Sequence, residues 1–77
     1  MKLYDLPRGA KIYVDSASDG SMFVIFDHVD GMYSFCETEK GNPVHLSAMS
    51  PLKEKGDGYE IAAENETRPP GEHKVVL

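Results

Sequence analysis

The sequence predicts a small all-β domain, either a five-stranded barrel or a curled antiparallel meander, with at most one short helical turn. Three observations lead to this fold class. The apolar residues gather in short segments rich in Val, Ile, Phe and Tyr, which are typical of strands. Turn signals that contain glycine separate these segments at regular intervals. No window keeps the helical period of about 3.6 residues over three turns.

Strands are expected over residues 11–14, 22–29, 32–38, 43–49 and 59–63. A turn at Leu6–Gly9 precedes the first, and Asp30-Gly31 joins the second and third as a hairpin. The remaining turns are Glu39–Asn42 and Lys55–Gly58, and a helical turn is expected at the N-terminus or near residues 47–52. Residues 1–63 are therefore predicted to form one domain, and the proline-interrupted residues 64–77 a flexible acidic tail.

Composition narrows the classes of function. The chain has 77 residues, a formal net charge of -5 and scattered basic residues, whereas nucleic-acid binders carry a basic stripe. Nucleic-acid binding is therefore disfavoured. Cys36 is the only cysteine, which excludes a disulfide within the chain and fits a reducing compartment. The sequence shows no signal peptide and no apolar run of about 20 residues, so a cytoplasmic protein without membrane contact is expected.

The hairpins predict which side chains share a face of the sheet. A two-residue loop at Asp30-Gly31 pairs Phe26 with Phe35, and a four-residue turn at 39–42 places Cys36 opposite His45. The predicted core face carries Met22, Val24, Phe26, Tyr33, Phe35, Val44, Leu46 and Ala48. The second face is unusually apolar for a solvated one, and it carries Phe23, Ile25, Asp27, Val29, Met32, Ser34, Cys36, His45, Ser47 and Met49.

This second face has two explanations. Either the sheet closes and the chain's own residues cover the face, or the face stays exposed as an apolar patch that marks a partner site. The second explanation predicts the partner-binding residues Phe23, Ile25, Met32, Cys36, His45 and Met49.

No residue pattern predicts catalysis or a metal site. Cys36 opposite His45 could activate a thiolate, but the pair lacks an orienting carboxylate and a cleft. His28 faces away from both, so the three side chains are not expected to bind a metal. The stretch KGDGYE lacks the spacing of a phosphate loop, and no cofactor or small-molecule substrate is expected.

The order of turns and strands over residues 9–63 resembles an SH3-like barrel. Three strings, DLPRG at residues 5–9, DGMYS at residues 30–34 and HLSA at residues 45–48, resemble small uncharacterised proteins of phages and bacterial mobile elements. SH3 domains that bind proline-rich peptides have a Trp, and this chain has none, so that activity is not implied. The phage resemblance implies no activity and no functional residue.

The function that the sequence predicts is that of a non-enzymatic protein-interaction module, which binds a partner or dimerises through the second face. The alternative is a nucleic-acid or nucleoprotein accessory factor, a role that small barrels often have.

Overall fold

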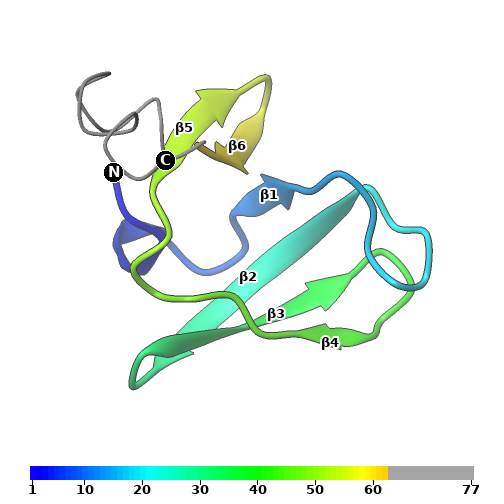
Figure 1. Ribbon diagram of the computed structural model, residues 1–77, viewed down its shortest axis with the longest axis horizontal. Coiled ribbons are helices and arrows are strands. Elements are labelled where there is room, and N and C mark those ends of the chain that lie inside the picture. Colours follow the sequence, from blue (N-terminus) through cyan, green and yellow to red (C-terminus); the bar gives the residue numbers. More distant parts are fainter. Residues whose placement is uncertain (63–77) are drawn as a thin grey trace, which may run out of the picture.

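The computed structural model describes residues 1–62, and the tail predicted over residues 64–77 lies outside them. The described residues form one 3-10 turn and six strands (Figure 1). The turn is η1 (Leu3–Asp5), and the strands are β1 (Lys11–Tyr13), β2 (Phe23–Asp30), β3 (Tyr33–Thr38), β4 (Pro43–Val44), β5 (Leu52–Lys55) and β6 (Gly58–Ile61). The all-β prediction is confirmed, and the helical turn lies at the N-terminus, one of the two expected places.

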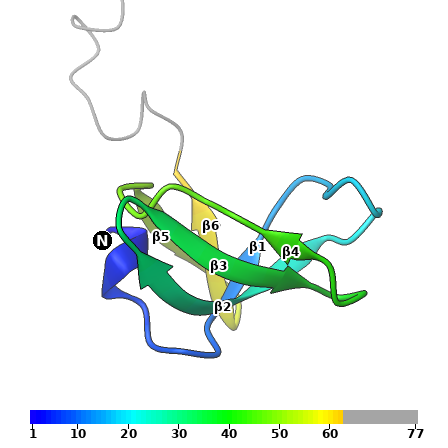
Figure 2. The ribbon, with the colours of Figure 1, turned by 90° about the horizontal axis from the view of Figure 1, so that it is seen from below.

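All six strands belong to one sheet with the order β4-β3-β2-β1-β6-β5. Neighbouring strands are antiparallel except β1 and β6, which run parallel. The sheet therefore has one strand more than predicted and is mixed, because the β5–β6 hairpin returns to pair with β1. Figure 2 shows that the sheet bends strongly, so a curled sheet describes it well.

The predicted hairpin registers are wrong, and both corrections have a local cause. Asp30 pairs with Tyr33, so the loop is Gly31-Met32, and Gly31 adopts the left-handed φ of 65° that its first position needs. A β-bulge between Phe26 and His28 then shifts the rest of the ladder. Because of these two changes, the partners are Phe26 with Cys36 and His28 with Phe35.

The turn between β3 and β4 is also displaced by one residue. Glu37 pairs with Pro43 and Cys36 with Val44, because Thr38, the last residue of β3, closes the turn. Its N–H donates to the Asn42 carbonyl at 2.8 Å, so the loop is residues 39–41. Cys36 therefore does not lie opposite His45. A shift of one residue exchanges the two faces of a strand, so the side chains of β3 are inverted relative to the prediction.

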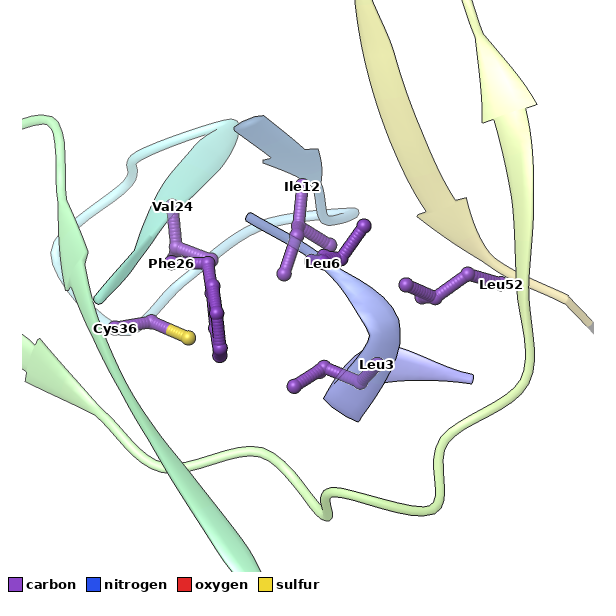
Figure 3. Packing of buried hydrophobic residues seen from close by; sticks show 7 residues of the cluster. All are labelled: Leu3, Leu6, Ile12, Val24, Phe26, Cys36 and Leu52. Atoms are coloured by element: carbon purple, nitrogen blue, oxygen red, sulfur yellow. The ribbon is translucent and has the colours of Figure 1, made fainter. Parts of the chain in front are cut away.

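The core lies between the β2–β3 hairpin and β5, and the N-terminal segment closes it (Figure 3). Its buried cluster is Leu3, Leu6, Ile12, Val24, Phe26, Cys36 and Leu52. Val24, Phe26 and Ala48 are buried as predicted, and Val44 and Leu46 pack against the cluster. Met22 and Tyr33 were predicted in the core but are 55% and 61% exposed, and Phe35 is half-buried on the other face. Cys36 takes the place predicted for Phe35.

The Asp19 carboxylate connects the loop before β2 to the turn between β3 and β4 through hydrogen bonds. Its Oδ2 accepts hydrogen bonds from Thr38 Oγ1 at 2.6 Å and from Asn42 Nδ2 at 2.7 Å, and its Oδ1 accepts one from the Ser21 N–H at 2.9 Å. These bonds, led by that of Thr38, hold the pKa of the Asp19 carboxyl well below its usual range. The charged carboxylate is thus the form that ties the two loops together.

We expect acid to weaken this connection. A carboxyl whose pKa is lower in the folded than in the unfolded chain stabilises the fold above the unfolded pKa of about 4 and loses that contribution as the pH falls. Urea midpoints of the wild-type protein should therefore fall between about pH 6 and about pH 3. In Asp19→Asn the midpoint should be lower at about pH 6 and should depend less on pH.

The control for this measurement is Asp15→Asn, a change in the same loop at a carboxylate that makes no hydrogen bond within residues 1–62. It should show the pH dependence of the wild type. An Asp19→Asn protein with the same acid sensitivity as this control would contradict the role assigned to Asp19.

Candidate functional site

The face of β2, β3 and β4 that turns away from the core is the candidate site, and we call it the outer face. The observed registers place Ile25, Glu37 and Pro43 side by side on it, and His28 beside Phe35. A groove of about 340 Å³ runs along this face. Its lining residues are Arg8, Gly9, Ile25, Phe26, Asp27, His28, Phe35, Cys36, Glu37 and Pro43. The groove thus joins apolar and charged groups that are far apart in the sequence.

One wall of the groove is a chain of polar contacts that starts at the bulge. Asp27 Oδ1 accepts a hydrogen bond from Arg8 Nε at 2.9 Å, and Asp27 Oδ2 lies 2.5 Å from His28 Nδ1. The Arg8 guanidinium and then the His28 ring lower the pKa of the Asp27 carboxyl, so it is ionised at neutral pH. These contacts place Arg8 and His28 beside the groove.

The aromatic ring of Phe35 is held between two imidazole rings. The His28 ring stacks on it with centroids 4.7 Å apart, and the His45 ring meets it edge-on at 4.6 Å. His45 is fixed in turn, because its Nδ1 lies 3.2 Å from the Ser34 carbonyl oxygen. The outer face therefore presents a half-buried aromatic surface whose neighbours are already in place.

The structure places five of the six predicted site residues at three positions on the surface. Ile25 and His45 lie on the outer face, at the groove and beside Phe35 respectively. Met32 and Met49 are 70% and 51% exposed, and they lie at the end of the sheet where Ala48 N–H donates to the Met32 carbonyl. Phe23 lies at the opposite end of the face, packed edge-on against Tyr13.

Cys36 is the predicted site residue whose side chain is buried in the core. Its side chain is 4% exposed, points towards the Phe26 ring and has its sulfur 3.4 Å from Ser34 Oγ (Figure 3). Burial raises the pKa of this thiol, which disfavours the nucleophilic thiolate. His45 lies on the other face, so the Cys36–His45 pairing considered from the sequence does not form.

Sequence reasoning missed Phe35 and His28 as surface groups because the registers placed them in or beside the core. The alternating pattern of Tyr33 to Thr38 fits either face of a strand, since each face receives apolar side chains. A single sequence gives no clear indication of where a β-bulge lies. His28 was the available signal, because histidine is less often fully buried than the apolar residues.

A second group of charged and aromatic side chains lies where β1, β2 and β6 meet. Lys11 Nζ lies 4.4 Å from the Phe23 ring centroid and 3.3 Å from Asp57 Oδ2. Tyr13 also donates a hydrogen bond to Asp57. On β5, Lys53 Nζ and Lys55 Nζ lie 3.3 and 3.1 Å from the Glu60 carboxylate oxygens. The cations of this region therefore already face carboxylates of the same sheet.

Within residues 1–62, no group of three or more His, Cys, Asp or Glu side chains is arranged to hold a metal ion. The same residues include no helix of the length and apolarity that crossing a bilayer requires. Comparison of the chain with models of protein families, with curated proteins and with solved structures finds no match in any of the three.

Proposed function

We propose that this protein is a non-enzymatic protein-interaction module that binds its partner through the outer face. The observation that carries this proposal is the groove in which Ile25 and Phe35 lie beside the Arg8–Asp27–His28 chain. Apolar and aromatic contact area surrounded by ordered polar groups is typical of the centre of a protein interface.

The order of these groups before binding supports the proposal. A partner pays for every side chain that it must immobilise, at about 0.5–1.5 kcal/mol each. Here the half-buried Phe35 ring lies against two imidazole rings. A partner that contacts this side chain therefore loses little affinity to its ordering.

The site we propose revises the set predicted from the sequence. The proposed site keeps Ile25 and His45 and adds Phe35 and His28. It excludes Cys36, which is part of the core. Met32 and Met49 extend the site towards the β2–β3 loop as exposed apolar side chains. The resemblance to small phage proteins stays a prediction and contributes no residue to this site.

We expect Phe35→Ser to remove partner binding. Loss of an aromatic side chain at an interface centre commonly costs 2 kcal/mol or more, roughly thirtyfold in affinity. Wild-type and variant proteins, immobilised at equal density, are exposed to an extract of the source cells, and retained proteins are quantified by mass spectrometry. Proteins retained through the outer face should be lost from Phe35→Ser.

The matched control is Met22→Ser, which removes an exposed apolar side chain that does not line the groove. Circular dichroism verifies that both variants are folded. Retention of the same proteins by the wild type, the control and Phe35→Ser would contradict the proposed site.

A homodimer is the simplest version of this proposal, because the outer face could pack against the same face of a second copy. Sedimentation at millimolar concentration distinguishes this version. A dimer that Phe35→Ser dissociates would support it, whereas a monomer would leave the outer face to a different protein.

The alternative, a nucleic-acid or nucleoprotein accessory factor, has weaker support. Arg8, Lys11 and Lys55 lie against Asp27, Asp57 and Glu60, so they do not form a stripe of free cations for phosphates. Retention on heparin that decreases with salt would favour this alternative. We expect the protein to pass through without retention.

A further inference from the structure

The segment from Pro43 to Ser47 is an open edge of the sheet. On the side that faces the β2–β3 hairpin, the Ala48 N–H donates to the Met32 carbonyl, and the Ser34 N–H donates to the Leu46 carbonyl at 2.7 Å. Backbone N–H and C=O groups of successive residues point to opposite sides of a strand. Because the Leu46 and Ala48 groups point towards β3, those of His45 and Ser47 point away from it. Neither amide N–H of these two residues has a hydrogen-bond partner within residues 1–62. Figure 1 shows β4 at the margin of the sheet, with no strand beyond it.

The two edges of this sheet differ in how they are protected. Proteins commonly protect an edge strand from pairing with charged side chains, lysine above all. The β5 edge has this protection, because Lys53, Glu54 and Lys55 follow one another along it. The 43–47 edge has no Lys, Arg, Asp or Glu, and Pro43 removes an outward N–H only at its first position. It is thus the edge that can accept another strand.

The unprotected edge lies directly beside the groove. Pro43 pairs with Glu37 across β3 and β4, and both line the groove with Phe35. The Glu37 carboxylate is exposed and makes no ion pair or hydrogen bond within residues 1–62. A segment bound at this edge would therefore meet an apolar surface and an uncompensated negative charge, on a chain whose net charge is -5.

We propose that the partner contributes an extended segment that pairs with residues 43–47 as an added strand. On the outer face, this segment carries an apolar side chain opposite His45, whose ring already contacts Phe35. Two residues away, and so on the same face, it carries a Lys or Arg that pairs with Glu37. Main-chain hydrogen bonds to His45 and Ser47 supply affinity, and the two side chains supply specificity. This inference rests on the proposed function, since it names how that partner binds.

The test uses a displayed library of random dodecapeptides selected on the full chain. The enriched sequences should share an apolar residue and a Lys or Arg two positions apart. One enriched peptide is then synthesised, and its affinity is measured by fluorescence anisotropy with the wild-type protein and its variants. If no peptide is enriched, the proposal that the partner binds as an extended strand is wrong. The proposed function is tested separately, by the retention experiment on Phe35→Ser.

The first pair of variants isolates the backbone contact. His45→Pro removes the outward N–H together with the ring, at an edge position where proline is tolerated, whereas His45→Ala removes the ring alone. We expect His45→Pro to bind the peptide about tenfold more weakly than His45→Ala, because one main-chain hydrogen bond is lost. Equal affinities in folded proteins would show that no strand is added, even if Phe35→Ser abolishes binding and the outer face remains the site.

The second pair isolates the charge contact and does not depend on the folding of His45→Pro. Selection on Glu37→Lys should replace the enriched Lys or Arg with Asp or Glu. Glu54→Lys makes the same change of net charge on the far edge and should enrich the same peptides as the wild type. An unchanged preference for basic residues in Glu37→Lys would overturn the assigned chemistry.

Discussion

Replacing Leu3 with alanine is expected to leave a large fraction of the molecules unfolded at room temperature. Leu3 belongs to η1 and has 0% exposure, because it fills the space between Phe26 and Leu52 (Figure 3). A buried Leu→Ala change costs about 2–5 kcal/mol. A chain of this length has a total stability of about 4–12 kcal/mol at about 0.05–0.15 kcal/mol per residue, so the loss is a large share of it.

Urea denaturation followed by far-ultraviolet circular dichroism measures this loss. Tyr4→Ala is the control, since its side chain is adjacent in sequence but exposed, and its backbone N–H bond to Ala48 does not involve the side chain. The control should lose less than about 1 kcal/mol. Equal midpoints for Leu3→Ala and the wild type would show that the N-terminal turn is not part of the core.

The second large effect is expected from Gly58→Ala. A Cβ at this position would lie 2.5 Å from the Lys11 carbonyl oxygen and 3.1 Å from the Lys11 Cβ. The carbonyl belongs to β1, so it cannot move aside without breaking the parallel pairing of β1 with β6. We expect a loss of about 3 kcal/mol and faster amide hydrogen exchange in β1 and β6 than in β2 and β3.

Gly56→Asn provides the comparison for this variant. Gly56 has a φ of 58° and no atom within 4 Å of an added Cβ, and asparagine tolerates this left-handed backbone better than most residues. Its stability should remain close to that of the wild type. If Gly58→Ala behaved like Gly56→Asn, the close approach of β1 and β6 would be wrong.

Local patterns predicted most of the strands, but they missed β5 and did not give the strand partners. The β-rich segments and glycine turns placed β2, β3 and β6 within a few residues of their positions, because these signals act between near neighbours. The parallel contact of Ile12 with Tyr59 depends on how the whole sheet closes. The same holds for Leu3, whose burial comes from contacts with residues remote in sequence.

The candidate site was predicted less well for a specific physical reason. The face to which a residue points depends on the exact loop and on every bulge between it and that loop. Ile25 keeps its predicted face, whereas the bulge at Asp27 reverses the faces of Phe35 and Cys36. The corrected loop alone would move their partners by two residues and leave their faces unchanged. A prediction of this site therefore needed the bulge at Asp27.

The way in which the N-terminal segment is held affects when the molecule can fold during synthesis. The Leu3 N–H donates to the Ser50 carbonyl, and β1 is completed only by β6. While the ribosome has synthesised the chain only as far as β3, Ile12 and Val24 have apolar neighbours on one side alone. The core thus closes late, after Leu52 and Tyr59 have emerged, and a chain cut before β5 remains exposed to proteases and to aggregation.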